Sequence, residues 1–186
     1  MINALERRDR WDGPLIRENN CTLSAGPHSL CILSPLGMYT WSSIHDYETT
    51  SGLGNDLLRR LRGKQIIEVG PGLAELTPTI ALSNEYPPPI IIEPVNLFDI
   101  QQILQSGIDN PGFALHKEML TVLLNRVLVL TSPKVRWIRE KIENIPQTHP
   151  ELAHQADTVI DIKAGTIYGE NFFQVYAIEH EFLQKK

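Results

Sequence analysis

The chain has 186 residues, of which 42% are hydrophobic and 21% are charged, as in an ordinary globular domain with a core of its own. Its formal net charge of −5 argues against binding nucleic acid through bulk positive charge and gives no strong nucleic-acid signal. The two cysteines, Cys21 and Cys31, and the scattered histidines lack zinc-ligand spacing, so we expect no metal site.

The sequence also predicts a soluble protein of the cytoplasm. The stretch MINALERRDRWDG is charged where a signal peptide would need an apolar core. The most apolar run, residues 119–130, contains Asn125 and Arg126 and is too short to span a bilayer, so we expect no membrane partner. In that compartment the two cysteines are expected to be reduced thiols, with a single disulfide as the alternative.

Residues 1–54 show no clear periodicity and carry several aromatic side chains among Gly, Pro and Ser. Two interpretations are open, with the first preferred: a loop-rich arm whose aromatic side chains pack on the main core, or a cap over a pocket. We therefore divide the chain into an N-terminal arm or cap, 1–54, and a main domain, 55–186.

Short apolar runs alternate with helical patterns along the main domain. Helices are predicted over residues 55–61, 74–82, 97–105, 115–130 and 170–185, and strands over 65–69, 90–92, 135–138 and 156–162. The VLVL that ends the fourth helical pattern is also compatible with a strand. This alternation predicts an α/β fold with a mainly parallel sheet, in which ligands bind beyond the carboxyl ends of the strands.

A glycine-rich turn follows the first predicted strand, in the stretch QIIEVGPGLAELT. Its pattern is acid-x-Gly-x-Gly-x-small, formed by Glu68, Gly70, Gly72 and Ala74, and the glycines allow close approach of the backbone to a ligand. The dinucleotide fingerprint needs a small residue where Glu75 stands, and a carboxylate at the start of a helix would repel a pyrophosphate. A P-loop is excluded because no Gly-Lys-Ser/Thr follows.

This pattern resembles motif I of the class I S-adenosylmethionine-dependent methyltransferases, and GPGLAELT is especially similar to the version in rRNA adenine dimethyltransferases. The resemblance implies a Rossmann-like domain, with helices on both faces of the sheet, that binds S-adenosylmethionine as its cofactor. It implies that Glu68 attracts the ammonium group of the methionine part, directly or through water. It also implies that Gly70, Pro71, Gly72 and Ala74 form the turn beside the cofactor.

The resemblance implies further cofactor contacts after the next two strands. Glu93 ends the stretch IIIE, where a carboxylate accepts hydrogen bonds from the ribose hydroxyls; NAD sites also place an acid in this region. After the third strand the family often has an acid and then a small or apolar residue flanking the adenine. In VRWIREKIENIP, Lys141 stands where the acid is expected and Ile142 follows, so Glu140 and Glu143 are the alternative acids.

The resemblance does not identify the methyl acceptor, small or macromolecular, or the catalytic residues. The stretch DIKA stands where adenine-N6 methyltransferases have an Asn/Asp-Pro-Pro-aromatic signature, so the likeness to the rRNA enzymes does not extend to the substrate. Asp161, Tyr39 and His45 are the candidates for chemistry in the pocket.

The resemblance covers residues 65–183, and we expect the fifth strand and final antiparallel hairpin of the family to be missing. The fourth strand, from Thr158 to Ile162, would then be an exposed edge. Truncation is the preferred explanation, with cover by the N-terminal arm or pairing with another chain in a homo-oligomer as alternatives. Three functions are compatible with these features: a methyltransferase, a non-catalytic relic or interaction module that associates through this edge, and, less well supported, a nucleotide-dependent oxidoreductase.

Overall fold

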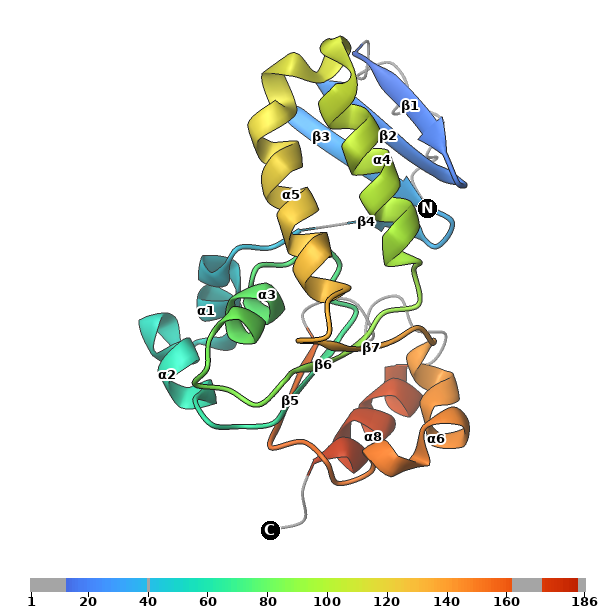
Figure 1. Cartoon of the computed structure of the whole chain (residues 1–186). Coiled ribbons are helices and arrows are strands. Elements are labelled where there is room, and N and C mark those ends of the chain that lie inside the picture. Colours follow the sequence, from blue (N-terminus) through green and yellow to red (C-terminus); the bar gives the residue numbers. More distant parts are fainter. Residues whose placement is uncertain (1–12, 40, 162–171, 184–186) are drawn as a thin grey trace. The chain divides into compact units, whose positions relative to one another are not determined.

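A computed structural model of the chain describes residues 13–39, 41–161 and 172–183 (Figure 1). The chain divides into two compact units, each with its own four-stranded sheet. The antiparallel unit is drawn from Met1–Thr40 and Val95–Leu128, and the parallel unit from Trp41–Pro94 and Val129–Lys186. This division differs from the single boundary between residues 54 and 55 that the sequence suggested, because a later segment packs with the N-terminal strands.

The antiparallel unit contains a sheet whose strands pair in chain order. These strands are β1 (Leu15–Glu18), β2 (Cys21–Gly26), β3 (Ser29–Ser34) and β4 (Gly37–Tyr39). The first hairpin turns at Asn19 and Asn20, whose φ angles of 49° and 62° suit a two-residue type I′ turn. The expectation of a loop-rich arm is therefore wrong for residues 15–39. Strands of three to six residues with Ser, Thr and Gly among them show too little alternation to be recognised.

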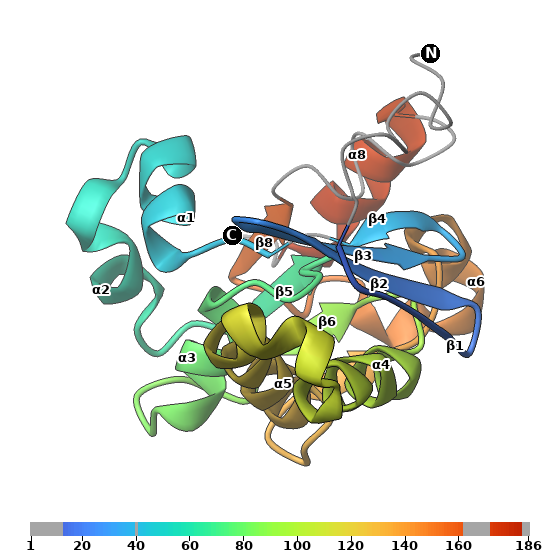
Figure 2. The same ribbon diagram turned by 90° about the horizontal axis from the view of Figure 1, so that it is seen from above.

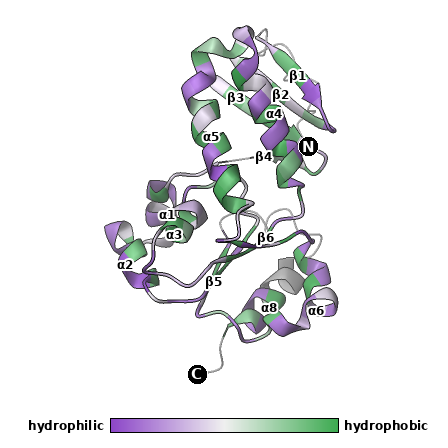
Figure 3. Ribbon diagram, viewed as in Figure 1, coloured by the Kyte–Doolittle hydropathy of each residue, from purple (hydrophilic) through white to green (hydrophobic). Residues whose placement is uncertain are grey.

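Helix α4 (Leu97–Asp109) packs on β1 and β2 (Figures 1 and 2). The approach is close at Gly107, where an added Cβ would lie 2.5 Å from Leu23 Cδ2 and 3.2 Å from Leu120 Cδ1. The chain continues through η3 (Pro111–His116) into α5 (Lys117–Leu130), so the VLVL stretch is helical. Hydrophobic and hydrophilic patches alternate along α4 and α5, as expected for helices with one buried face (Figure 3).

The parallel unit contains a sheet in the order β7-β6-β5-β8, with all its strands parallel. Its strands are β5 (Ile66–Val69), β6 (Ile90–Ile92), β7 (Arg136–Ile138) and β8 (Thr158–Asp161). In chain order this arrangement is third, second, first, fourth, which is the order of the first four strands in a common type of doubly wound sheet. The prediction of an α/β fold with a parallel sheet is confirmed for this unit, whereas the additional antiparallel sheet was not predicted.

Helical segments contribute to hydrophobic clusters on both faces of the parallel sheet. They are α1 (Ile44–Ser51), α2 (Leu57–Leu61), α3 (Leu76–Leu82), η4 (Ile142–Asn144), α6 (Ile145–Thr148), η5 (Pro150–Leu152) and α8 (Phe172–Phe182). The short helical turn η2 (Gly54–Asp56) lies between α1 and α2 and has no buried residue. Ile66 packs with α1, α2 and α3, whereas Ile67 and Val69 pack with α6 and α8. Because successive side chains of a strand point to opposite faces, Glu68 shares the face of Ile66 and thus the side of α1.

Strand β8 lies at the end of the sheet formed by the described residues. The segment before it bonds to the end of α8: the Ala156 N–H donates to the Phe182 carbonyl oxygen at 2.8 Å, and Ala156 forms a bridge with Leu183. Among the described residues, no helix is long and apolar enough to cross a membrane.

Candidate functional site

The carboxyl ends of the four parallel strands meet at one edge of the sheet. The register aligns Asp161, Val69, Ile92 and Ile138 across that edge. The glycine turn therefore leaves β5 directly beside Glu93, which follows β6. The candidate site is the set of residues around these two strand ends, as the sequence predicted for Glu68, the glycine turn and Glu93.

The glycine turn is locked to the neighbouring strand by its own backbone. Gly70 and Gly72 have φ angles of 56° and 57°, in the left-handed region that glycine adopts without strain. The Gly70 N–H donates to the Ile92 carbonyl oxygen at 2.8 Å, and the Ala74 N–H donates to the Pro71 carbonyl oxygen at 3.0 Å. Both glycines are thus needed for the conformation of the turn, independently of any ligand.

Glu68 is only 1% exposed, and each of its carboxylate oxygens accepts a hydrogen bond from a hydroxyl group. The donors are the Tyr47 hydroxyl from α1 and the Thr77 hydroxyl from the first turn of α3. Burial raises the pKa of Glu68; the two hydroxyl hydrogen bonds oppose this rise, and the negative charge of Asp161 adds to it. Tyr47 was not predicted as a site residue, because nothing in the local sequence connects it to a strand 21 residues away.

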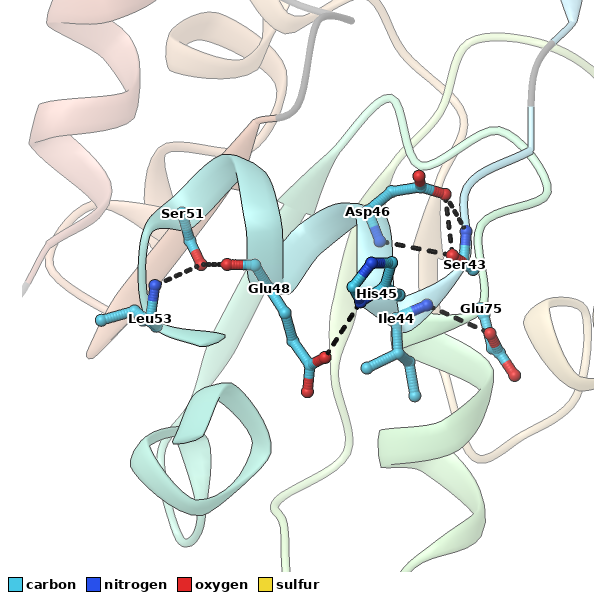
Figure 4. Close-up of polar contacts among 8 residues, drawn as sticks. All are labelled: Ser43, Ile44, His45, Asp46, Glu48, Ser51, Leu53 and Glu75. Carbon is cyan, nitrogen blue, oxygen red and sulfur yellow. Dashed lines mark hydrogen bonds and ion pairs between the residues drawn. The ribbon is translucent and has the colours of Figure 1, made fainter. Parts of the chain in front are cut away.

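Glu75 binds the start of α1 (Figure 4). Its Oε2 atom accepts a hydrogen bond from the Ile44 N–H at 3.1 Å, and its own N–H donates to the Ser42 carbonyl oxygen at 2.9 Å. Ser43 and Asp46 complete a capping box at the same helix end. The carboxylate of Glu75 is therefore directed at α1, which weakens the expected repulsion of a pyrophosphate, whereas the absence of a small residue at position 75 still disfavours a dinucleotide site.

Glu93 is 3% exposed and lies against the glycine turn. Its Oε2 atom accepts a hydrogen bond from the Gly72 N–H at 3.3 Å. The backbone of Glu93 is held on the other side, where its N–H donates to the Ile138 carbonyl oxygen and its carbonyl oxygen accepts from the Trp137 indole N–H, both at 3.0 Å. The structure thus fixes a buried carboxylate at the position expected from the sequence, and adds Trp137 as an unpredicted support.

The residues proposed to flank an adenine have other partners here. Ile142 is buried in the hydrophobic cluster between the sheet and the α6 and α8 helices. The Glu140 carboxylate accepts a hydrogen bond from the Asn144 side chain at 3.1 Å. The assignment of Ile142, and of Glu140 or Glu143, to an adenine site stays a prediction.

The three candidates for pocket chemistry lie in different surroundings. Tyr39 is buried on β4 of the antiparallel unit, opposite Ile32. His45 is 83% exposed on α1, with Nδ1 3.8 Å from the Glu48 carboxylate (Figure 4). Asp161 is half-buried at the end of β8 and interacts electrostatically with Glu68. Of these three, Asp161 is the one that the described contacts connect to the candidate site.

Asp161 also forms a carboxyl pair with Glu179 of α8. Burial raises the pKa of Glu179 to about 8. A hydrogen bond to Asp161 and the negative charge of Asp161 add to this rise. The Glu179 carboxyl therefore keeps its proton at neutral pH, and the sequence carries no local signal for this contact. Within the part of the chain that the structure describes, no group of three His, Cys, Asp or Glu side chains is arranged to hold a metal ion.

No protein-family model matches the chain, and the search of curated proteins found no match either.

Proposed function

We propose that the parallel unit is a Rossmann-like domain of the class I methyltransferase type, which binds S-adenosylmethionine and transfers its methyl group. The observation that carries the proposal is the hydrogen bond from Gly72 to Glu93. It brings a buried carboxylate against a left-handed glycine turn at the carboxyl edge of a parallel sheet, where doubly wound folds bind their ligands.

The donors and acceptors of this site suit the parts of the proposed cofactor. The Glu93 carboxylate has the acceptor capacity to bind both hydroxyls of a ribose, and the Gly72 N–H that it now holds would become available to the ligand. Gly70 and Gly72 leave no Cβ in the way of an approaching ligand. Glu68, two residues before Gly70, supplies a second carboxyl group, which suits an ammonium group.

When bound, S-adenosylmethionine supplies a methyl group that its sulfonium has already activated. The protein then has to align the acceptor, exclude water and accept a proton if the acceptor carries one. Asp161, at the end of β8 and paired with Glu179, is the described group best placed to accept a proton. Pro71 and Ala74, with Ile142 and Glu140, are proposed to line the cofactor site.

Isothermal titration calorimetry with S-adenosylmethionine, its demethylated product S-adenosylhomocysteine, and NAD tests this proposal. We expect saturable binding of the first two ligands with one site per chain, and no binding of NAD. The absence of heat at ligand concentrations of about 1 mM would limit the affinity to about 4 kcal/mol and would contradict the proposal. Binding of NAD alone would favour an oxidoreductase.

A second candidate function is self-association through β8. It is favoured by the sheet order, since β8 has a single strand neighbour, β5, among the described residues. Light scattering over a range of concentrations tests it, because edge pairing predicts a mass that rises with concentration. A constant monomer mass would exclude this function. Val159 is unsuitable as a probe of the edge, because its side chain packs against the hydrophobic cluster of α6 and α8.

A further inference from the structure

We infer that Tyr47 is a positioning residue of the proposed cofactor site: its hydroxyl group holds the Glu68 carboxylate so that it attracts the ammonium group of the ligand. The inference rests on the proposed function. It gives α1, which lies outside the glycine motif, a role in recognising the amino-acid part of the ligand.

The Tyr47 hydroxyl is bonded to Glu68 from within a hydrophobic cluster. The Tyr47 side chain is 3% exposed and packs in the cluster formed by α1, α2, α3 and the sheet face that carries Glu68. From there its hydroxyl donates to one oxygen of Glu68, while Thr77 donates to the other. The orientation of the carboxylate is therefore set by two side chains on two different helices.

The Tyr47 hydroxyl also favours the charged form of Glu68. A carboxylate withdrawn from water favours the neutral form, and a neutral carboxyl attracts an ammonium group weakly. The two hydroxyl hydrogen bonds lower the pKa of Glu68 against the effect of burial, whereas Asp161, which is paired with Glu179, raises it. Removal of the Tyr47 hydroxyl shifts this balance toward the neutral form.

Helix α1 is held in the parallel unit by contacts other than the Tyr47 hydroxyl. Glu75 bonds to Ile44 and Ser42 at the start of α1, and the Tyr47 ring is held by the hydrophobic cluster. A Tyr47→Phe substitution therefore removes the hydrogen bond to Glu68 and leaves these anchors in place. The role of the hydroxyl is thereby separable from the docking of the helix.

Tyr86 provides a matched control. It packs against the same cluster, and its hydroxyl donates to the Leu58 carbonyl oxygen at 3.0 Å, not to Glu68. Tyr86→Phe thus removes one partly buried hydroxyl hydrogen bond from the same region. A general loss of packing or stability is expected in both variants, and a change in ligand selectivity in Tyr47→Phe alone.

The test compares two ligands that share the nucleoside and differ in the amino-acid part: S-adenosylhomocysteine and 5′-methylthioadenosine. Calorimetry is done with the unsubstituted protein, Tyr47→Phe and Tyr86→Phe, after circular dichroism has shown that each is folded. In Tyr47→Phe we expect affinity for S-adenosylhomocysteine to fall about tenfold, because the carboxylate loses one of its two hydrogen-bond donors, with affinity for 5′-methylthioadenosine unchanged. Tyr86→Phe is expected to bind both ligands like the unsubstituted protein.

The outcomes separate this inference from the proposed function. If the unsubstituted protein binds S-adenosylhomocysteine and Tyr47→Phe loses no affinity, or loses it equally for both ligands, the inference is overturned and the proposed function stands. If the unsubstituted protein binds neither ligand, the proposed function fails and this inference fails with it. If Tyr47→Phe does not fold, Thr77→Val, which removes the other hydroxyl donor to Glu68, is expected to show the same selective loss.

Discussion

The two units of this protein differ most clearly in what they bury. Among the described residues, the antiparallel unit buries one polar side chain, Ser24. The parallel unit buries Glu68, Thr77 and Glu93 around one glycine turn. Burying a polar or charged group costs free energy unless it is well bonded. The concentration of such groups in one place is the reason why we propose the ligand site in the parallel unit, whereas the antiparallel unit buries mainly apolar side chains.

The first way to test this comparison is to damage the core of the antiparallel unit. Leu23→Ala removes a fully buried side chain that packs beside Gly107 of α4, so we expect a loss of about 3 kcal/mol in unfolding free energy. A urea titration followed by circular dichroism measures it. Calorimetry on the folded variant should give an unchanged affinity for S-adenosylhomocysteine. A large loss of affinity would show that the two units do not differ in function as proposed.

The next substitution addresses the carboxylate beside the glycine turn. Glu93→Ala is expected to weaken binding of S-adenosylhomocysteine by about 2 kcal/mol, or roughly 30-fold, because hydrogen bonds to a charged acceptor are lost. Glu85→Ala, which removes an exposed carboxylate bonded to Arg62, is the control and should bind normally. Equal affinities of the two variants in calorimetry would argue against a role for Glu93 in binding.

A pair of glycine substitutions separates the effect of backbone strain in the turn from the effect of losing contact with the ligand. Gly72→Ala and Gly54→Ala place a Cβ at φ angles of 57° and 52°, and each is expected to cost about 1 kcal/mol of unfolding free energy. At Gly54 the added Cβ would meet nothing within 4 Å. We therefore expect similar destabilisation in urea but reduced cofactor affinity only for Gly72→Ala. Reduced affinity in both variants would mean that backbone strain alone explains the effect.

The last comparison concerns the dependence of stability on pH. The pKa of Glu179 is about 8 in the folded protein and 4.5 ordinarily, so the folded state binds the proton more tightly than the unfolded state. Stability contributed by this group is therefore complete below about pH 4.5 and declines as the pH rises to about 8. Glu179→Gln should reduce this decline, without abolishing it, because the pKa of Glu68 is raised in the same direction. Urea titrations at several pH values measure it, and an equal or steeper decline in the variant would contradict the assignment.

The parallel unit could be predicted from the sequence because its signals are local. The apolar runs that form β5 and β6 are bounded by charged residues, glycines or prolines, and the glycine turn is a contiguous pattern. The order of the strands, by contrast, depends on pairings between distant segments. The position of α4 could not be predicted either, because its apolar face is compatible with any sheet surface and its actual partners, β1 and β2, lie far away in the sequence.

The candidate site was predicted only in part for the same reason. Glu68, Gly72 and Glu93 follow from motif spacing, whereas Tyr47 reaches Glu68 through the docking of a helix that has no motif of its own. The turn with Gly70 and Gly72 could be predicted from the sequence. The turn at Asn19 and Asn20 was not predicted, although two consecutive asparagines favour the left-handed φ angles observed there.

The central claim is that the ligand binds at the glycine turn of the parallel unit, and hydrogen exchange measured with and without S-adenosylhomocysteine tests it most directly. We expect the ligand to slow exchange of the amides of residues 70, 72–75 and Glu93, and to leave the amides of β2 and β3 unchanged. Slowed exchange that is confined to β2 and β3, or no change anywhere at saturating ligand, would contradict the account.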